Sequence, residues 1–328
     1  MTNIYIPKYR EIITNDVIES TCKVEGEIRL ILRDENENVV YDSGWFHNLI
    51  TNQGLWNMGN GSGLTWAQRC VVGSDATAPA FTDTALYGYM ASDQMGSNFV
   101  SLYPVAPNYE FSSTQNCRFE LGEAIGTIRE IGFQSGTDPD NTLLSVRALV
   151  SPPVVKTGSQ ILDVYYRFKR WPEISDVTGS VMIKGESYDY IVRGSYYANA
   201  DPSLNAFSNL GIGSSAVITA YIGEIGGIES FPTGVAGAPG TQYASSRGYT
   251  DGGSNTGLGT GWSNWWIYFG LTRGVGDLRS FYLREAGHGV GTPRGWQIRI
   301  GKTTGDGPLP KADTEEMYIY FRVNYARI

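Results

Sequence analysis

Two stretches of this chain, PVVKTGSQILDVYYRFKR at residues 153–170 and PLPKADTEEMYIYFRVNY at residues 308–325, decide the expected fold because they repeat one pattern. The residues that recur at the same spacing are Pro153, Lys156 and Arg167 in the first stretch and Pro308, Lys311 and Arg322 in the second. Both stretches also alternate apolar and polar residues, which is typical of a strand with one buried face. The shared spacing and strand phase together indicate an internal duplication.

The apolar residues of each repeat predict one buried row, because successive side chains point to opposite faces of a strand. The expected rows are Leu162, Val164, Tyr166 and Phe168 in the first repeat and Met317, Ile319, Phe321 and Val323 in the second. An earlier stretch, CKVEGEIRLILRD, predicts a third row of the same kind, formed by Val24, Ile28, Leu30 and Leu32. The turn sequence ENEN follows it and predicts a hairpin.

The composition suits a β-rich globular protein. The 328 residues include 41 Gly, 21 Tyr and 8 Trp, and charged residues make up only 18%. Aromatic residues favour strands and glycines favour turns. The formal net charge is −8 and no basic run stands out, so we expect no nucleic-acid partner. No stretch approaches the roughly 18 consecutive apolar residues of a membrane span, so we expect no membrane insertion.

The cysteines and the N-terminal sequence favour assembly in a cytoplasm. Cys22, Cys70 and Cys117 form no CxxC motif and cannot all pair internally, so we expect reduced, partly buried thiols. The first 20 residues have no continuous apolar stretch and predict no signal peptide.

The chain divides into two predicted β domains behind an arm. Residues 1–20 alternate weakly and lack a core-sized apolar set, which predicts an N-terminal arm. Residues 21–172 form the first domain, in which HNLITNQGLWNMGN holds one short helix or an ordered loop. Pro172 breaks strand pairing, and residues 173–328 form the second domain, with a Gly-rich insertion at 223–261. We predict an all-β fold of two tandem antiparallel β-sandwich-like domains.

Histidine chemistry has little support in this sequence. His47 and His288 are the two histidines, and neither accompanies a nucleophile motif such as G-x-S-x-G. A structural zinc site would need more His or Cys at ligand spacing. Paired carboxylates for glycoside hydrolysis need only spatial proximity, but the sequence offers no pair to name. We therefore expect no catalytic residue and no enzyme activity.

Two loops resemble ligand-binding motifs but fit plain turns better. Gly301-Lys302-Thr303 matches the end of a phosphate-binding loop, yet the upstream glycine is displaced and no helix pattern follows. The sequence GTDPDNT clusters oxygen ligands of the kind that calcium prefers, without the glycine and distal glutamate of a helix-loop-helix site. Its candidate ligands are Asp138, Asp140 and Asn141. We expect no cofactor and no metal.

An aromatic cluster in GWSNWWIYFG offers candidate contacts. In strand phase Trp265, Ile267 and Phe269 share one face, and Trp266 and Tyr268 share the other. One set is expected in the core, and the other faces solvent, a neighbouring subunit or a sugar ring. Core packing and subunit contact are favoured over sugar binding. The candidate partner or glycan contacts are Trp262, Trp266 and Tyr268.

Three segments resemble a pattern found in virion proteins of tailed bacteriophages. They are DSGWFHNLITNQGL (Asp42–Leu55), VVGSDATAPAFTDTAL (Val71–Leu86) and FELGEAIGTIREIGF (Phe119–Phe133). In such proteins a strand ending in N-[LI]-I-T-x-x-G-L precedes a VG-…-P-…-D-T-x-L segment, and I-x-E-I-G and K-…-Y-R strands follow. The resemblance covers most of residues 24–171, whereas only strand endings match in 173–328. It implies β-sandwich modules of tail fibres, collars, baseplates and related appendages, and it transfers no functional residue.

The resemblance implies a structural virion protein that acts through contacts with copies of itself and with other virion proteins. A tail-associated position is expected, in a particle assembled in the host cytoplasm. A capsid decoration or head-fibre protein is the first alternative, and a receptor-binding module that grips a host-surface glycan is the second. A depolymerase is least supported, because no β-helix repeat is present.

Overall fold

The computed structural model describes residues 10–59, 67–96, 100–102, 109–136, 143–196, 217–227, 250–251, 261–269, 275–284 and 294–328. Three sequence expectations lie outside these residues: the turn with Asp138, Asp140 and Asn141, the loop with His288, and most of the Gly-rich insertion at 223–261.

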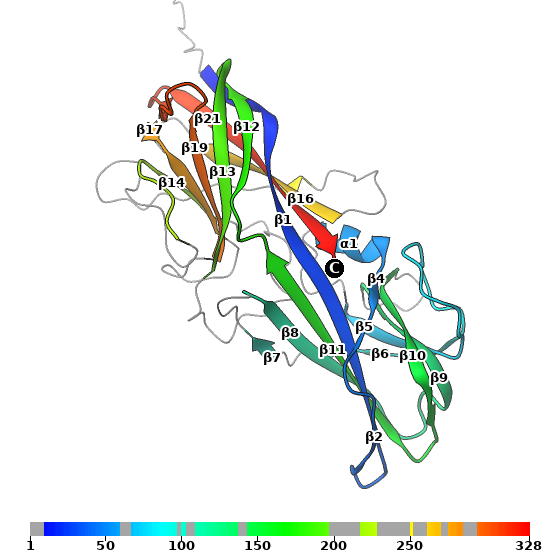
Figure 1. Ribbon diagram of the computed structural model, residues 1–328. Coiled ribbons are helices and arrows are strands. Elements are labelled where there is room, and N and C mark those ends of the chain that lie inside the picture. The colour runs from blue at the N-terminus through cyan, green and yellow to red at the C-terminus, as the bar shows by residue number, and fades with distance from the viewer. Residues whose placement is uncertain are drawn as a thin grey trace, which may run out of the picture.

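One strand of 24 residues, β1 (Arg10–Arg33), runs from one end of the molecule to the other (Figure 1). Its second half pairs antiparallel with β11 (Ile161–Pro172), and its first half pairs in parallel with β21 (Glu315–Arg327). The two pairings overlap at residues 22–24, where β1 has a neighbouring strand on both edges. The two sequence repeats therefore flank one shared strand.

Residues 10–20, which the sequence assigns to an arm, lie in the sheet. They pair with β21, and Thr14 also faces Ile183 of β12 (Val177–Ile183). Ile18 is 0% exposed and Ser20 is 2% exposed. Few apolar residues suffice here because pairing with β21 satisfies backbone groups along one edge of the segment. The pairing of β1 with β21 is parallel, which departs from the purely antiparallel expectation.

The first half of the chain forms two layers. One layer is a five-stranded sheet whose order is β4–β10–β9–β5–β6. Its strands are β4 (Leu49–Ile50), β5 (Arg69–Gly73), β6 (Tyr89–Gln94), β9 (Gly126–Gln134) and β10 (Leu144–Lys156). The other layer joins the second half of β1 to β11, with four further strands: β2 (Val39–Asp42), β3 (Phe46–His47), β7 (Val100–Leu102) and β8 (Phe111–Phe119). The layers pack together, since the rings of Phe133 and Tyr166 lie 4.5 Å apart.

The second half of the chain has a related two-layer arrangement, but the pairing of β12 with β1 joins its layers into one 14-stranded sheet. One layer has the order β14–β18–β19–β13–β12, and the other places β21 between the first half of β1 and β16. The strands not yet introduced are β13 (Glu186–Tyr196), β14 (Val217–Tyr221), β15 (Thr250–Asp251), β16 (Gly261–Phe269), β18 (Ser280–Arg284) and β19 (Arg294–Lys302). The rings of Trp296 and Phe321 lie 5.8 Å apart and join the two layers.

A small feature shows how closely the halves correspond. In β9 and β10, Gly126 lies opposite Lys156. In the two-stranded sheet of β17 (Gly276–Leu278) and β20 (Leu309–Lys311), Gly276 lies opposite Lys311. Both glycines have positive φ, +135° and +131°, and both lysines are almost fully buried. Such correspondences are those expected of an internal duplication.

The buried rows and turns confirm several local predictions. The three expected apolar rows are buried, with no member more than 4% exposed. The β12–β13 turn has Lys184 and Gly185 at φ of 53° and 79°, as a two-residue hairpin turn requires. Lys302 N–H donates to the Gly307 carbonyl at 2.7 Å, so the GKTTG segment is a turn between β19 and β20. No helix follows it.

The all-β prediction is confirmed, with one short helix in the part of the chain that the structure describes. That helix, α1 (Asn52–Gly59), lies in the segment for which a helix or a loop is expected. Among the described residues no helix has the length and apolar character needed to cross a membrane. Buried apolar side chains from both halves belong to one connected cluster, which includes Ile18 and Val24 of β1. The domain boundary at residue 172 stays a prediction.

Candidate functional site

The three aromatic residues selected from the sequence lie on β16, which pairs with β21. The register places Trp262 opposite Asn324, Trp266 opposite Tyr320 and Tyr268 opposite Tyr318. Trp262 is partly buried, and the Arg322 guanidinium lies 4.8 Å from the centre of its ring. That ring face is therefore already occupied by a cation. The side chains of Trp266 and Tyr268 lie outside the described residues.

The most developed polar site is a buried cluster that the sequence analysis did not select. Arg147 of β10 is 0% exposed and donates to Glu130 of β9 from Nε at 3.0 Å and from Nη2 at 2.8 Å. Its Nη1 donates to Asp83 at 2.7 Å. The carbonyls of Thr77 and Ala78 accept at 2.8 and 3.4 Å, so each of the five N–H donors has a partner. We call Arg147, Glu130 and Asp83 the arginine clamp.

The clamp fixes the loop of residues 74–88 onto the sheet. Glu130 also accepts the backbone N–H of Gly88 at 2.6 Å, and Asp83 accepts the N–H of Ala80 at 2.8 Å. A Cβ added at Gly73 would lie 2.5 Å from Glu130 Oε1, so only glycine permits this approach. The loop is therefore held by charge-assisted hydrogen bonds that are shielded from water.

The electrostatics of the clamp follow from its charges. Burial alone would lower the pKa of Arg147, but the hydrogen bonds and charges of Asp83 and Glu130 raise it above its usual value. Burial would likewise raise the pKa of Asp83. The N–H of Ala80 and the guanidinium of Arg147 outweigh burial, and the pKa of Asp83 is lowered. Asp83 and Arg147 are therefore both charged at neutral pH.

The outer face of the clamped segment presents aromatic side chains. Phe81, Tyr87 and Tyr89 are 49%, 62% and 58% exposed. The guanidinium of Arg147 lies 4.6 Å from the ring centre of Tyr87, and that of Arg327 lies 4.1 Å from that of Phe81. These cation–π contacts hold rings that remain open to solvent. We call Phe81 and Tyr87 the aromatic loop residues, and Tyr89 follows them as the first residue of β6.

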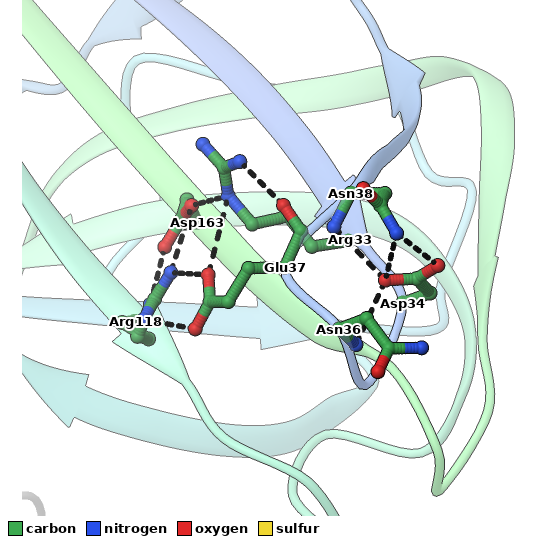
Figure 2. Close-up of polar contacts among 7 residues, drawn as sticks. All are labelled: Arg33, Asp34, Asn36, Glu37, Asn38, Arg118 and Asp163. Carbon is green, nitrogen blue, oxygen red and sulfur yellow. Dashed lines mark hydrogen bonds and ion pairs between the residues drawn. The ribbon is translucent and has the colours of Figure 1, made fainter.

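A second polar network, drawn in Figure 2, fixes the β1–β2 turn, which lies at the end of the molecule opposite β17 (Figure 1). Asp163 of β11 is 2% exposed and accepts from Arg33 Nε and from Arg118 Nε, each at 2.7 Å. Arg118 also donates to both carboxylate oxygens of Glu37, at 3.0 and 2.8 Å. Asp163 and Glu37 raise the pKa of Arg118 through these hydrogen bonds. The network contains two guanidinium groups and two carboxylates, so its positive and negative charges are equal in number.

Residues within this turn are also hydrogen-bonded to one another. Asp34 accepts the backbone N–H groups of Asn36 and Asn38, each at 2.9 Å, and the Asn38 side-chain amide at 3.0 Å (Figure 2). These bonds lower the pKa of Asp34, with the contribution of Asn38 the largest. Such a local arrangement is typical of a rigid turn.

One cluster among the described residues has metal-like spacing, namely Glu25, Glu27 and His47. Cations already occupy Glu27, since Lys169 Nζ lies 2.9 Å and Arg167 Nε 2.7 Å from its carboxylate. Burial would raise the pKa of Glu27, but Lys169 and Arg167 lower it. His47 Nδ1 contacts the Glu25 carboxylate. Because Lys169 and Arg167 already pair with Glu27, the cluster is a network of polar contacts within the protein.

Comparisons of this chain with protein-family models, with curated proteins and with solved structures find no match. The proposed function therefore rests on three structural features. They are the arginine clamp, the hydrogen-bond network at the β1–β2 turn, and the strand β1 that both halves share.

The clamp leads to a pH-dependent prediction. The pKa of Asp83 in the folded chain lies below its ordinary value of 3.8, so its charge adds stability above that value. This stability is lost as pH falls below 3.8 through the folded-state pKa. We expect Asp83→Asn to cost about 1–3 kcal/mol at pH 7. The cost should shrink as pH falls below 3.8 and should be smallest below the lowered pKa, where the folded wild-type carboxylate is also protonated.

Urea unfolding of both chains at pH 7 and near pH 3 measures this difference. Asp189→Asn is a control, because Asp189 is exposed on β13 and accepts from the hydroxyl groups of Ser180 and Thr303. A gap between wild type and Asp83→Asn that stays constant or widens at low pH would contradict the assignment.

Proposed function

We propose that this chain is a structural subunit of a tailed-bacteriophage particle, tail-associated as part of a fibre, collar or baseplate. It acts through contacts with copies of itself and with other virion proteins rather than through catalysis. The particle is assembled in the host cytoplasm. The resemblance of the segments at Asp42–Leu55, Val71–Leu86 and Phe119–Phe133 to phage virion proteins supports the proposal.

The observation that carries the proposal is the sharing of β1 by two corresponding halves. β11 and β21 flank this one strand, and the apolar cluster includes residues of both halves. A strand paired on both edges at residues 22–24 cannot act as a flexible linker, because bending there would break backbone hydrogen bonds. The chain is therefore a stiff double unit. Stiff β-sandwich units with loops at their ends provide surfaces suited to assembly.

The aromatic loop residues support a docking surface on the first half. Aromatic side chains are enriched at the centres of protein interfaces. Phe81 and Tyr87 belong to a loop that the arginine clamp holds in place, so little conformational entropy is lost when a partner covers them. We assign the contact with the particle to this half. The second half, which carries β16 with Trp262, then faces outward.

Mass spectrometry of heads and tails separated from purified virions tests this function. We expect peptides of this chain in the tail fraction, at a constant ratio to a tail-tube protein, and not in the head fraction. Known capsid and tail-tube proteins serve as markers of the two fractions. Recovery with heads would contradict tail association and favour the capsid decoration or head-fibre alternative. Absence from complete virions would contradict a structural role altogether.

A further inference from the structure

Two buried thiols from opposite layers of the first half meet inside the protein. Cys70 lies on β5 and is 0% exposed, and Cys117 lies on β8 and is 3% exposed. Both are free, and the Cys70 side chain lies close enough to the Cys117 thiol to raise its pKa. The third cysteine, Cys22, is buried on β1, where its cross-strand neighbours are Pro172 and Tyr325. The pair is therefore distinct from the remaining thiol.

The two layers converge at this corner. Face-to-face sheets normally lie about 10 Å apart. Here the N–H of Gly96, just after β6, donates directly to the carbonyl of Asn116 in β8 at 2.7 Å. The amide of Gln115 also donates to the Ala67 carbonyl, just before β5, at 2.9 Å. Gln115 and Asn116 of β8 directly precede Cys117, and Ala67 lies just before β5, so these bonds hold the two layers together beside the thiol pair.

The surroundings keep Cys117 as a thiol while the chain is reduced and folded. Burial raises the pKa of the Cys117 thiol, and Cys70, Asp93 and Asp163 add to the effect. A thiolate is the reactive form in thiol–disulfide exchange, so attack from solvent is slow in the folded protein. Oxidation therefore requires folding in an oxidising medium or a transient opening of this corner.

We propose that Cys70 and Cys117 are the site of an inter-layer disulfide, which forms when the chain meets a disulfide oxidant such as oxidised glutathione. The thiolate of one cysteine attacks a sulfur of oxidised glutathione and releases one molecule of glutathione. The thiolate of the other then attacks the protein sulfur of this mixed disulfide and releases the second. Both thiols lose a proton, the two sulfurs become bonded, and the oxidant is reduced to two glutathione molecules.

Such a bond would lock the two layers of the first half to each other. It would close the long loop between residues 70 and 117, which restricts the unfolded chain and so favours the folded state. This inference concerns the redox chemistry of the chain and holds whether or not the chain belongs to a phage tail.

Refolding of the full-length chain tests the site. The chain is refolded from urea with oxidised and reduced glutathione, and in parallel with dithiothreitol. After oxidative refolding, wild type should keep one free thiol, measured under denaturing conditions, and Cys22→Ala should keep none. Peptide mapping without reduction should identify the bond between Cys70 and Cys117. A bond that includes Cys22, a bond between two chains, or a folded chain that retains all its thiols would overturn the proposal.

Stability provides a second readout. Oxidation should raise the urea midpoint of wild type and of Cys22→Ala, and should leave those of Cys70→Ala and Cys117→Ala unchanged. If either alanine variant does not fold, comparison of oxidised and reduced Cys22→Ala decides the matter alone. An oxidised midpoint equal to or below the reduced one would show that the folded layers do not accommodate the bond, and would likewise overturn the proposal.

Discussion

Replacing Arg147 with alanine is expected to lower the free energy of unfolding by about 3–5 kcal/mol. The substitution leaves Asp83 and Glu130 without their cation, and their side chains are only 3% and 0% exposed. It also removes the donors to the carbonyls of Thr77 and Ala78. Two uncompensated buried charges cost far more than the loss of one surface ion pair. Urea unfolding at pH 7 measures the effect.

Arg29→Ala provides the matched control for this prediction. Arg29 donates from Nε to Asp42 at 2.9 Å, but both side chains are about a third exposed. Water screens such a pair, so its loss should cost only about 0–1 kcal/mol. A cost at Arg147 as small as that at Arg29 would contradict the clamp. Limited proteolysis should also show faster cleavage within residues 74–88 of Arg147→Ala.

Replacing Ile18 with aspartate is expected to prevent stable folding or to cost more than about 4 kcal/mol, because it places a carboxylate at a fully buried position. Ile18 lies opposite Phe321 in the parallel pairing of β1 and β21, so the damage should centre on the second half of the chain. An arm that only frays in solvent would tolerate the change. Circular dichroism and the urea midpoint distinguish these outcomes.

Two further variants keep this test interpretable. Lys23→Asp changes an exposed position of the same strand and should stay within about 0.5 kcal/mol of wild type. Ile18→Val removes a single methylene and should cost about 0.5–1.5 kcal/mol. If Ile18→Asp proved as stable as Lys23→Asp, residues 10–20 would not be part of the folded core.

Local features could be predicted because they depend on neighbours in the sequence. The alternation at Leu162–Phe168 and Met317–Val323 specifies which face of each strand is buried, and the structure confirms both rows. The turn sequence ENEN likewise marks the hairpin between β1 and β2. The two lysines of the repeat, Lys156 and Lys311, stand out in the sequence only by their shared spacing. Their burial could not be expected from charge alone.

Long-range features could not be predicted in this way. The sequence of residues 10–20 does not indicate that this segment pairs with β12 and β21. Both partners lie far along the chain, so the pairing depends on the tertiary structure. The sequence contains one indication of the arginine clamp, because the charged residue Arg147 lies inside the apolar run LLSVRALV. A charge in a buried strand requires a buried partner, but its partners Glu130 and Asp83 come from other segments.

The parallel pairing of β1 and β21 also determines how the chain bears mechanical load. Arg10 begins one strand and Arg327 ends the other, and the two strands run side by side in the same direction. A pull applied at these two positions would slide the strands along each other, so their hydrogen bonds resist together instead of opening one by one. Tension between the first and last strands therefore meets a shear joint, which suits a component that stays attached while a particle is pulled.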